Sequence, residues 1–227
     1  MRINRWLAMA GVASRRGADN LIADGVVKIN GRKAVLGDVV GDMDKIEVSG
    51  KQVGSFEKKV YYLLNKPAGI LSTVIDDRGR ETVIALAGIK ERVFPVGRLD
   101  QDTTGLLILT NDGELSYRLT HPKFGIEKTY EVSFDGDVTL QQIEKLTKGV
   151  YLDDGKTRRA EVNRGATGKL LITLKEGKKR QVRRMCEVVG VKLYQLKRIK
   201  MGKLTLGDLA EGATRELTPE EIKDLSL

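Results

Sequence analysis

The sequence predicts an α+β protein in two parts: a small N-terminal module of helices and a hairpin, and a larger domain on a mixed, mainly antiparallel sheet. Short apolar, β-compatible runs alternate with helical patterns along the 227 residues. Several of these runs lie too close together for the helical crossover that parallel neighbours need. With 41% hydrophobic residues, the chain is long enough for one full core and a smaller second module.

The N-terminal module, residues 1–48, begins with two predicted short helices. The first runs from Asn4 to Ala10 and ends at Gly11. Ser14 is placed to cap a second helix that extends to Gly25, because a serine hydroxyl can accept from the free N–H groups of the first turn. We therefore expect two helices joined by a tight turn.

A tight hairpin is predicted at Asn30-Gly31, which separates β-compatible runs at 26–29 and 33–35. Both residues tolerate the positive φ that a type I′ turn requires. Residues 49–58 mix glycines with polar residues and show no period, so we expect a flexible linker there. The larger domain then spans residues 59–227.

The larger domain shows an irregular succession of strand and helix patterns. Strands are predicted at 60–64, 106–109, 129–134, 160–162, 170–174, 191–199 and 204–206, and helices at 114–120, 140–146 and 180–189.

Charge favours a polyanionic partner. The chain has 40 Lys plus Arg against 31 Asp plus Glu, a net charge of +9. The segment from Lys175 to Lys203 holds eleven basic and two acidic residues, so the whole excess is concentrated there.

The single cysteine and single histidine exclude several kinds of site. One cysteine forms no internal disulfide and no Cys-rich metal cluster, and Cys186 fits a helical core position as a small apolar residue. A Ser-His-Asp or His-rich zinc mechanism would depend on His121 alone, which we expect to be a helix-end residue.

No targeting or membrane segment is apparent. No apolar run approaches the roughly 18 residues that a membrane span requires, and the N-terminus lacks the apolar core of a signal peptide. We expect a cytoplasmic protein without membrane association, and a monomer.

The stretch from Gly97 to Gly113 places Asp100 and Asp102 directly before the apolar run 106–109. Aspartates in loops commonly accept hydrogen bonds from backbone donors, and this interpretation stays open on spacing alone. A calcium loop is excluded, because its twelfth position would be Asn111 instead of a bidentate Glu, and a strand follows where a helix is needed.

The stretch 97–113, with Gly-Arg-Leu-Asp at 97–100, resembles the active-site motif of RNA pseudouridine synthases of the RsuA/RluB type. Lys128-Thr129-Tyr130 and the run Gln181 to Met185 are similar to two further motifs of that family. The helices and hairpin of residues 1–48 resemble an S4 RNA-binding domain. Together these similarities cover nearly the whole chain and imply the pseudouridine synthase fold.

The resemblance implies a role for each motif residue. Asp100 is the expected nucleophile, which attacks the target uridine at the sugar or at the base. Tyr130 is expected first to support the uracil ring and second to carry a proton. Arg183 is expected to pair with Asp100 and keep its carboxylate ionised. Arg98 is expected to fill the gap that a flipped-out nucleotide leaves in the RNA. The family's chemistry requires no cofactor and no metal.

The expected partner is ribosomal RNA or a ribosome assembly intermediate. The motifs resemble the RluB type, whose substrate is large-subunit RNA, more than the RsuA type, and this favours 23S rRNA. Basic side chains expected to contact RNA are Arg15 and Arg16 in the N-terminal module and Lys178, Lys179, Arg180 and Arg184 in the larger domain.

Other interpretations remain open. By residue type alone, Tyr130 could be a packing residue, Arg98 a salt-bridge residue, and the paired arginines 15–16 and 183–184 solvated faces. Alternative functions are a 16S rRNA pseudouridine synthase, a catalytically silent rRNA-binding assembly factor, and an N-glycosidase that would use Asp102 to activate water.

Overall fold

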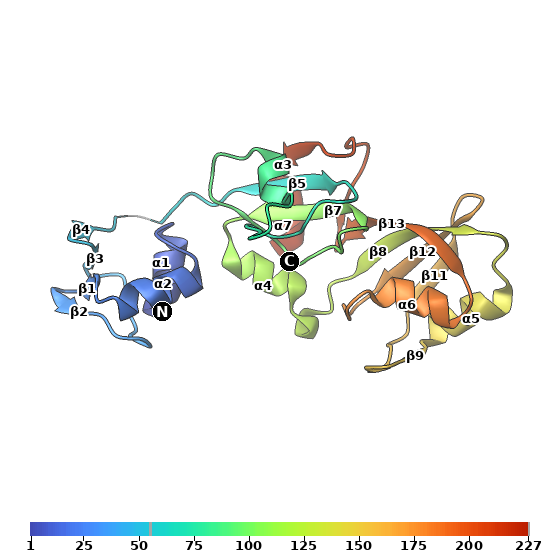
Figure 1. The fold of residues 1–227 in the computed structure, drawn as a ribbon, viewed down its shortest axis with the longest axis horizontal. Coiled ribbons are helices and arrows are strands. Elements are labelled where there is room, and N and C mark those ends of the chain that lie inside the picture. Colours follow the sequence, from blue (N-terminus) through green and yellow to red (C-terminus); the bar gives the residue numbers. More distant parts are fainter. Residues whose placement is uncertain (55, 227) are drawn as a thin grey trace. The chain divides into compact units, whose positions relative to one another are not determined.

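The computed structural model describes residues 1–54 and 56–226, which divide into two compact units, Met1–Lys59 and Val60–Leu227. Each unit has its own core. Figure 1 shows the α/β composition of each. Within the described residues, every helix is too short or too polar to traverse a bilayer.

The N-terminal unit contains the two predicted helices, α1 (Ile3–Met9) and α2 (Arg15–Ala23). The Ser14 hydroxyl accepts from the Gly17 N–H at 3.0 Å, as its position predicts. The helices pack on a four-stranded sheet of order β2-β1-β3-β4. Its strands are β1 (Val27–Ile29), β2 (Arg32–Lys33), β3 (Ile46–Val48) and β4 (Lys51–Gln52).

The hairpin prediction is confirmed, and the linker prediction is wrong at its start. Asn30 and Gly31 have φ of 51° and 84°, as a type I′ turn needs. Residues 51–52 form β4, which pairs with β3, and the Val53 N–H donates to the Ile46 carbonyl. Composition could not reveal this, because so short an edge strand carries no periodic signal.

The larger unit is built on a mixed sheet with the strand order β11-β12-β8-β13-β7-β5-β15. In addition, β14 pairs with β13, and β6 pairs with β7. The strands are β5 (Tyr61–Lys66), β6 (Phe94–Pro95), β7 (Thr104–Thr110), β8 (Lys128–Asp135), β11 (Glu161–Arg164), β12 (Lys169–Leu174), β13 (Lys192–Met201), β14 (Leu204–Thr205) and β15 (Thr214–Glu216). The pair β13 and β7 is parallel and the other pairs are antiparallel, as predicted.

Helices cover this sheet in two groups. α5 (Leu140–Lys148) and α6 (Gln181–Val188) contribute to the core of β8, β12 and β13, whereas α4 (Gly113–Thr120) and α7 (Pro219–Ser226) contribute to the core of β5 and β7. α3 (Val83–Ala87) packs in a third cluster, a 3-10 turn η1 (Pro122–Phe124) follows α4, and β9 (Tyr151–Leu152) with β10 (Gly155–Lys156) forms a separate hairpin. In the larger unit, the sequence did not predict α3, β6, η1, β9, β10, β15 or α7.

The two halves of the sheet meet where β7 runs beside β13. The registered partners are Lys197 with Thr104 and Arg198 with Gly105. Gly105 has φ of +100°, and a Cβ there would lie 2.2 Å from the Arg198 carbonyl oxygen. Only glycine allows this close approach, so residue 105 fixes how the two halves join.

Candidate active site

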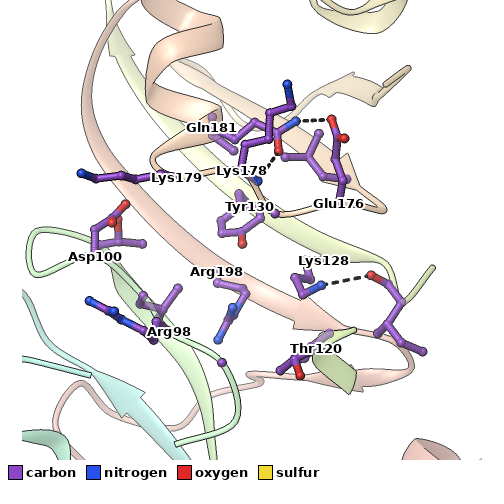
Figure 2. Close-up of a pocket in the computed structure, with 18 of the residues that line it drawn as sticks. Arg98, Asp100, Thr120, Lys128, Tyr130, Glu176, Lys178, Lys179, Gln181 and Arg198 are labelled. Carbon is purple, nitrogen blue, oxygen red and sulfur yellow. Dashed lines mark hydrogen bonds between the residues drawn. The ribbon is translucent and has the colours of Figure 1, made fainter. Parts of the chain in front are cut away.

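A cavity of about 740 Å³ lies at this junction. The loop before β7 contributes residues 96–100, and β8 and β13 contribute Tyr130 and Arg198. Residues 174–182, which lead into α6, form the opposite wall. Figure 2 shows Asp100, Tyr130 and Arg198 reaching this space from three different elements.

The residue before Asp100 is held in the protein interior. The Leu99 side chain is buried in the cluster that includes Leu64 and Leu107. Its two backbone groups bind one hydroxyl, because Ser72 Oγ donates to the Leu99 carbonyl at 2.9 Å and accepts from the Leu99 N–H at 3.2 Å. Asp100 therefore follows a fixed backbone position.

The residues after Asp100 are held by a fully buried lysine. Lys66 ends β5 with 0% exposure, and its Nζ donates to the carbonyls of Pro67 (2.9 Å), Gln101 (3.2 Å) and Thr103 (3.0 Å). Burial lowers the pKa of Lys66 to about 8, against the opposing charges of the carboxylates at 102 and 100. The turn that carries Asp100 is therefore held from both sides.

The Asp100 carboxylate itself is uncommitted. None of the hydrogen bonds or ion pairs found within residues 1–54 and 56–226 uses its oxygens. Its charge acts on two nearby cations, since it opposes deprotonation of Lys66 and contributes to the raised pKa of Arg180, whose main cause is the hydrogen bond with Asp102. A half-buried carboxylate in this positive surrounding is available as a nucleophile.

Tyr130 is brought to the same cavity. It lies on β8, directly opposite Ile172 of β12 and Arg198 of β13. Its ring is half-buried and lines the cavity, so one surface remains accessible. The structure thus places an aromatic ring and the Asp100 carboxylate at one cavity, as the motifs predict.

The prediction that Arg183 pairs with Asp100 is not met. Arg183 Nη2 donates to the Asp102 carbonyl at 2.9 Å and lies 3.4 Å from the Asp102 carboxylate. Arg180 forms two hydrogen bonds with the same carboxylate, at 3.1 and 3.2 Å. Arg183 thus joins the loop that carries Asp100 to α6. The spacing of the residues in the sequence could not predict that Arg183 would bind Asp102 and not Asp100, because both carboxylates belong to the same turn.

Asp102 is engaged as the partner of these arginines. Burial disfavours its charge, yet the hydrogen bonds from Arg180 and the charges of Arg183 and Arg180 keep the pKa of Asp102 below its usual range. It does not belong to the residues that line the cavity. Both facts argue against Asp102 as the water-activating base of an N-glycosidase.

The predicted RNA-contacting residues fall into four groups. Arg180 is exposed and lines the cavity, and it forms two hydrogen bonds with Asp102. Arg98 and Lys179 are exposed and line the cavity. Lys178 and Arg184 form ion pairs with Asp154 at 3.6 and 2.7 Å. Arg15 and Arg16 are exposed in the first turn of α2, in the N-terminal unit.

Lys66, Ser72 and Arg198 hold or line the site and were not predicted. Lys128 belongs to the Lys128-Thr129-Tyr130 motif, which assigned it no role of its own. Lys66 carries no local signal, because a lysine between a strand and a proline is ordinarily exposed. Arg198 carries no such signal either, because the strand 191–199 is a mixture of basic and apolar residues.

The expectations for Cys186 and His121 are confirmed. Cys186 is buried, and burial raises the pKa of its thiol to about 12. His121 follows α4 and accepts from the Lys123 N–H through Nδ1 at 3.2 Å, which caps η1.

Comparison with known proteins decides the family. Residues 60–188 match the RNA pseudouridylate synthase family, and residues 1–46 match the S4 domain. The chain belongs to the RNA pseudouridylate synthase family. The matched region of this pseudouridylate synthase contains Asp100, Tyr130 and Arg183.

Relatives resemble this pseudouridylate synthase along its whole length. Ribosomal large subunit pseudouridine synthase B of Bacillus subtilis is 44% identical, over 99% of this chain and 95% of the relative. The dual-specificity RNA pseudouridine synthase RluF of Escherichia coli K12 is 36% identical, over 99% and 78%. A crystal structure of a pseudouridylate synthase, 32% identical, superposes with a TM-score of 0.72 and covers 99% of both chains. Fold and enzyme class agree with the sequence prediction.

Proposed function

We propose that this pseudouridine synthase isomerises a specific uridine of 23S ribosomal RNA, with Asp100 as the nucleophile. The observation that carries the proposal is the uncommitted Asp100 carboxylate, which is held by its backbone at a cavity that also contains Tyr130. The names of the relatives from Bacillus subtilis and Escherichia coli support RNA, and the former supports the large ribosomal subunit.

In the proposed reaction, an Asp100 oxygen bonds to C1′ of the target nucleotide as the bond from C1′ to N1 breaks. The electron pair stays with the uracil, which turns while it remains bound. C5 then bonds to C1′, the Asp100 carboxylate leaves, and the proton on C5 is transferred to N1. Tyr130 supports the ring of the detached base, which would otherwise diffuse away.

The target must leave the RNA stack to reach this cavity, at a cost of a few kcal/mol. Arg98, exposed at the cavity, is placed to occupy the gap that the nucleotide leaves. Lys179 is exposed at the opposite wall and suits phosphate contacts. Arg180 is already paired with Asp102, and Lys178 and Arg184 share Asp154, so these three would make weaker ones.

In the N-terminal unit, Arg15 and Arg16 are proposed to bind backbone phosphates at the start of α2. Replacing both with Gln should weaken RNA binding and reduce the slope of log affinity against log salt by about 2. An unchanged slope in a filter-binding titration would remove them from the interface. We place the reaction in the cytoplasm, on free 23S rRNA or an assembly intermediate.

The function is tested with unmodified 23S and 16S rRNA transcripts and with assembly intermediates from cells that lack the enzyme. Pseudouridine is mapped by carbodiimide-dependent primer-extension stops after incubation with wild type or Asp100→Asn. We expect one new stop in 23S rRNA with wild type and none with Asp100→Asn, which still binds RNA. A stop confined to 16S rRNA would make the small-subunit RNA the substrate. Binding without any stop would indicate an assembly factor. Equal modification by both proteins would remove Asp100 from the mechanism.

A further inference from the structure

Arg198 is a buried cation at the cavity whose hydrogen bonds are incomplete. Only 2% of its surface is exposed, and its Nε donates to the Leu106 carbonyl at 2.8 Å. Its Nη2 is buried and has no hydrogen-bond partner in the part of the chain that the structure describes. An unpaired donor on a buried guanidinium is costly, so its retention at a cavity points to a ligand that completes it.

Arg198 lies in the same row of the sheet as Tyr130. Residues directly opposite on neighbouring strands project from one face, and Arg198 of β13 is opposite Tyr130 of β8 and Gly105 of β7. Both side chains line the cavity, and Figure 2 shows them side by side on its wall. A ring stacked on Tyr130 would therefore bring its edge toward Arg198.

The surroundings of Arg198 are positive. Lys128 lines the same part of the cavity and donates to the Ile126 carbonyl at 3.4 Å. The pKa of Lys128 is lowered by burial and by the charge of Arg198. No ion pair joins Arg198 to a carboxylate among the described residues. The part of the cavity beside Arg198 and Lys128 therefore suits an electron-rich ligand group that is either uncharged or anionic.

We propose that the Arg198 guanidinium donates a hydrogen bond to a carbonyl oxygen of the target uracil and stabilises the negative charge on the base when its glycosidic bond breaks. The inference rests on the proposed function, which brings a uracil to Tyr130. The burial of Arg198 deep in the cavity favours the base over a phosphate as its hydrogen-bond partner. The flipped base enters the cavity, where Arg198 is buried, whereas the RNA backbone stays with exposed side chains such as Lys179.

The charge in question arises in a defined step. As Asp100 bonds to C1′ and the bond to N1 breaks, the electron pair is shared among N1 and the two carbonyl oxygens of the uracil. A cationic donor that is already in place lowers the energy of this anion without having to reorganise. Such preorganised electrostatic stabilisation is usually the largest single contribution to an enzyme's rate enhancement. The charge is lost again when C5 bonds to C1′ and the proton reaches N1, so Arg198 neither gains nor loses a proton.

The first test compares Arg198→Gln with wild type at saturating enzyme, on a short RNA hairpin that carries the mapped uridine. We expect the single-turnover rate to fall about 100-fold, as for other lost donors to a developing anion, while the Kd for the hairpin changes less than about threefold. Lys197→Gln removes the neighbouring cation, which does not line this cavity, and should retain the wild-type rate.

The second test separates a contact with the base from a structural role. The uridine is replaced by 2-thiouridine or 4-thiouridine, because sulfur is a weak hydrogen-bond acceptor. In one of the two positions, sulfur should slow wild type about tenfold more than it slows Arg198→Gln. Arg198→Lys, which keeps the charge, should show an intermediate rate. Circular dichroism melts identify a variant that fails to fold, in which case Arg198→Lys carries the thio comparison.

The outcomes keep the two proposals apart. Equal slowing of wild type and variant by both thio substitutions, or a wild-type rate in folded Arg198→Gln, overturns the role of Arg198 alone. Product formation by Asp100→Asn removes Asp100 from the mechanism, and the absence of pseudouridine after incubation with wild type overturns the proposed function instead.

Discussion

The two walls of the cavity are held by different forces. The loop that carries Asp100 is held by buried contacts, namely the fully buried Lys66, the Ser72 hydroxyl and the close approach of Gly105 to β13. The opposite wall, where α6 begins, is joined to its surroundings by ion pairs such as Arg184 with Asp154, whose side chains are 24% and 48% exposed. Buried contacts are worth several kcal/mol when broken, and exposed pairs less than about one. The start of α6 has buried groups as well, since Gln181 and Val182 are each 4% exposed. The turn that carries the nucleophile is thus held mainly by buried contacts, whereas the basic side chains of the opposite wall are held by exposed ion pairs.

The largest effect is expected at the junction of the two half-sheets. Gly105→Ala would place a Cβ 2.2 Å from a backbone oxygen at φ of +100°, so the strands must separate. We expect a loss of about 3 kcal/mol or more in the free energy of unfolding, measured by urea denaturation. Gly113→Ala is the matched control, because no atom lies within 4 Å of its added Cβ, and it should change stability by less than about 0.5 kcal/mol. Similar stabilities for the two variants would contradict the role of residue 105.

The next effect is expected at Lys66. Lys66→Met leaves three carbonyls without their donor, which should destabilise the protein by about 2 kcal/mol at pH 7 and slow uridine conversion. Lys90→Met, at an exposed lysine, serves as the control. A Lys66→Met protein as stable and active as the control would show that the loop needs no such support.

Lys66 also makes stability depend on pH. Its pKa is about 8 in the folded protein, below the ordinary lysine value of 10.5 that the unfolded chain retains. Between these values the unfolded chain binds a proton that the folded protein has released, so raising the pH favours the folded state. From pH 8 to pH 10, wild type should gain about 2 kcal/mol relative to Lys66→Met in urea unfolding. A constant difference over this range would mean that Lys66 keeps an ordinary pKa.

The smallest effect is expected at the α6 wall. Arg184→Gln breaks an exposed ion pair and should cost less than about 1 kcal/mol, and this cost should shrink in 1 M salt. A loss above 2 kcal/mol would mean that the second wall is as firmly held as the first.

Sequence reasoning succeeded where local signals decide the structure. The apolar run at Leu106 to Leu109, the dipeptide Asn30-Gly31 and the cap at Ser14 each specify their element through nearby residues alone. It also brought Asp100 and Tyr130 to one cavity through the family motifs.

It failed where long-range packing decides. Lys66 and Arg198 are buried because strands distant in sequence enclose them, and residue type alone predicts exposure for both. Arg183 selects Asp102 over Asp100 through the path of the loop. The helix α7 was missed although it is as long as α4 and α6, because its apolar pattern consists of Ile222 and Leu225 alone.

The central claim is that Asp100 reacts whereas Asp102, two residues later, holds the loop to α6. The most direct test measures single-turnover uridine conversion by Asp100→Asn and Asp102→Asn on the same RNA. We expect no product above background for Asp100→Asn, and for Asp102→Asn a rate reduced by about 10- to 100-fold through misplacement of the loop. Complete inactivity of Asp102→Asn together with activity of Asp100→Asn would contradict the account.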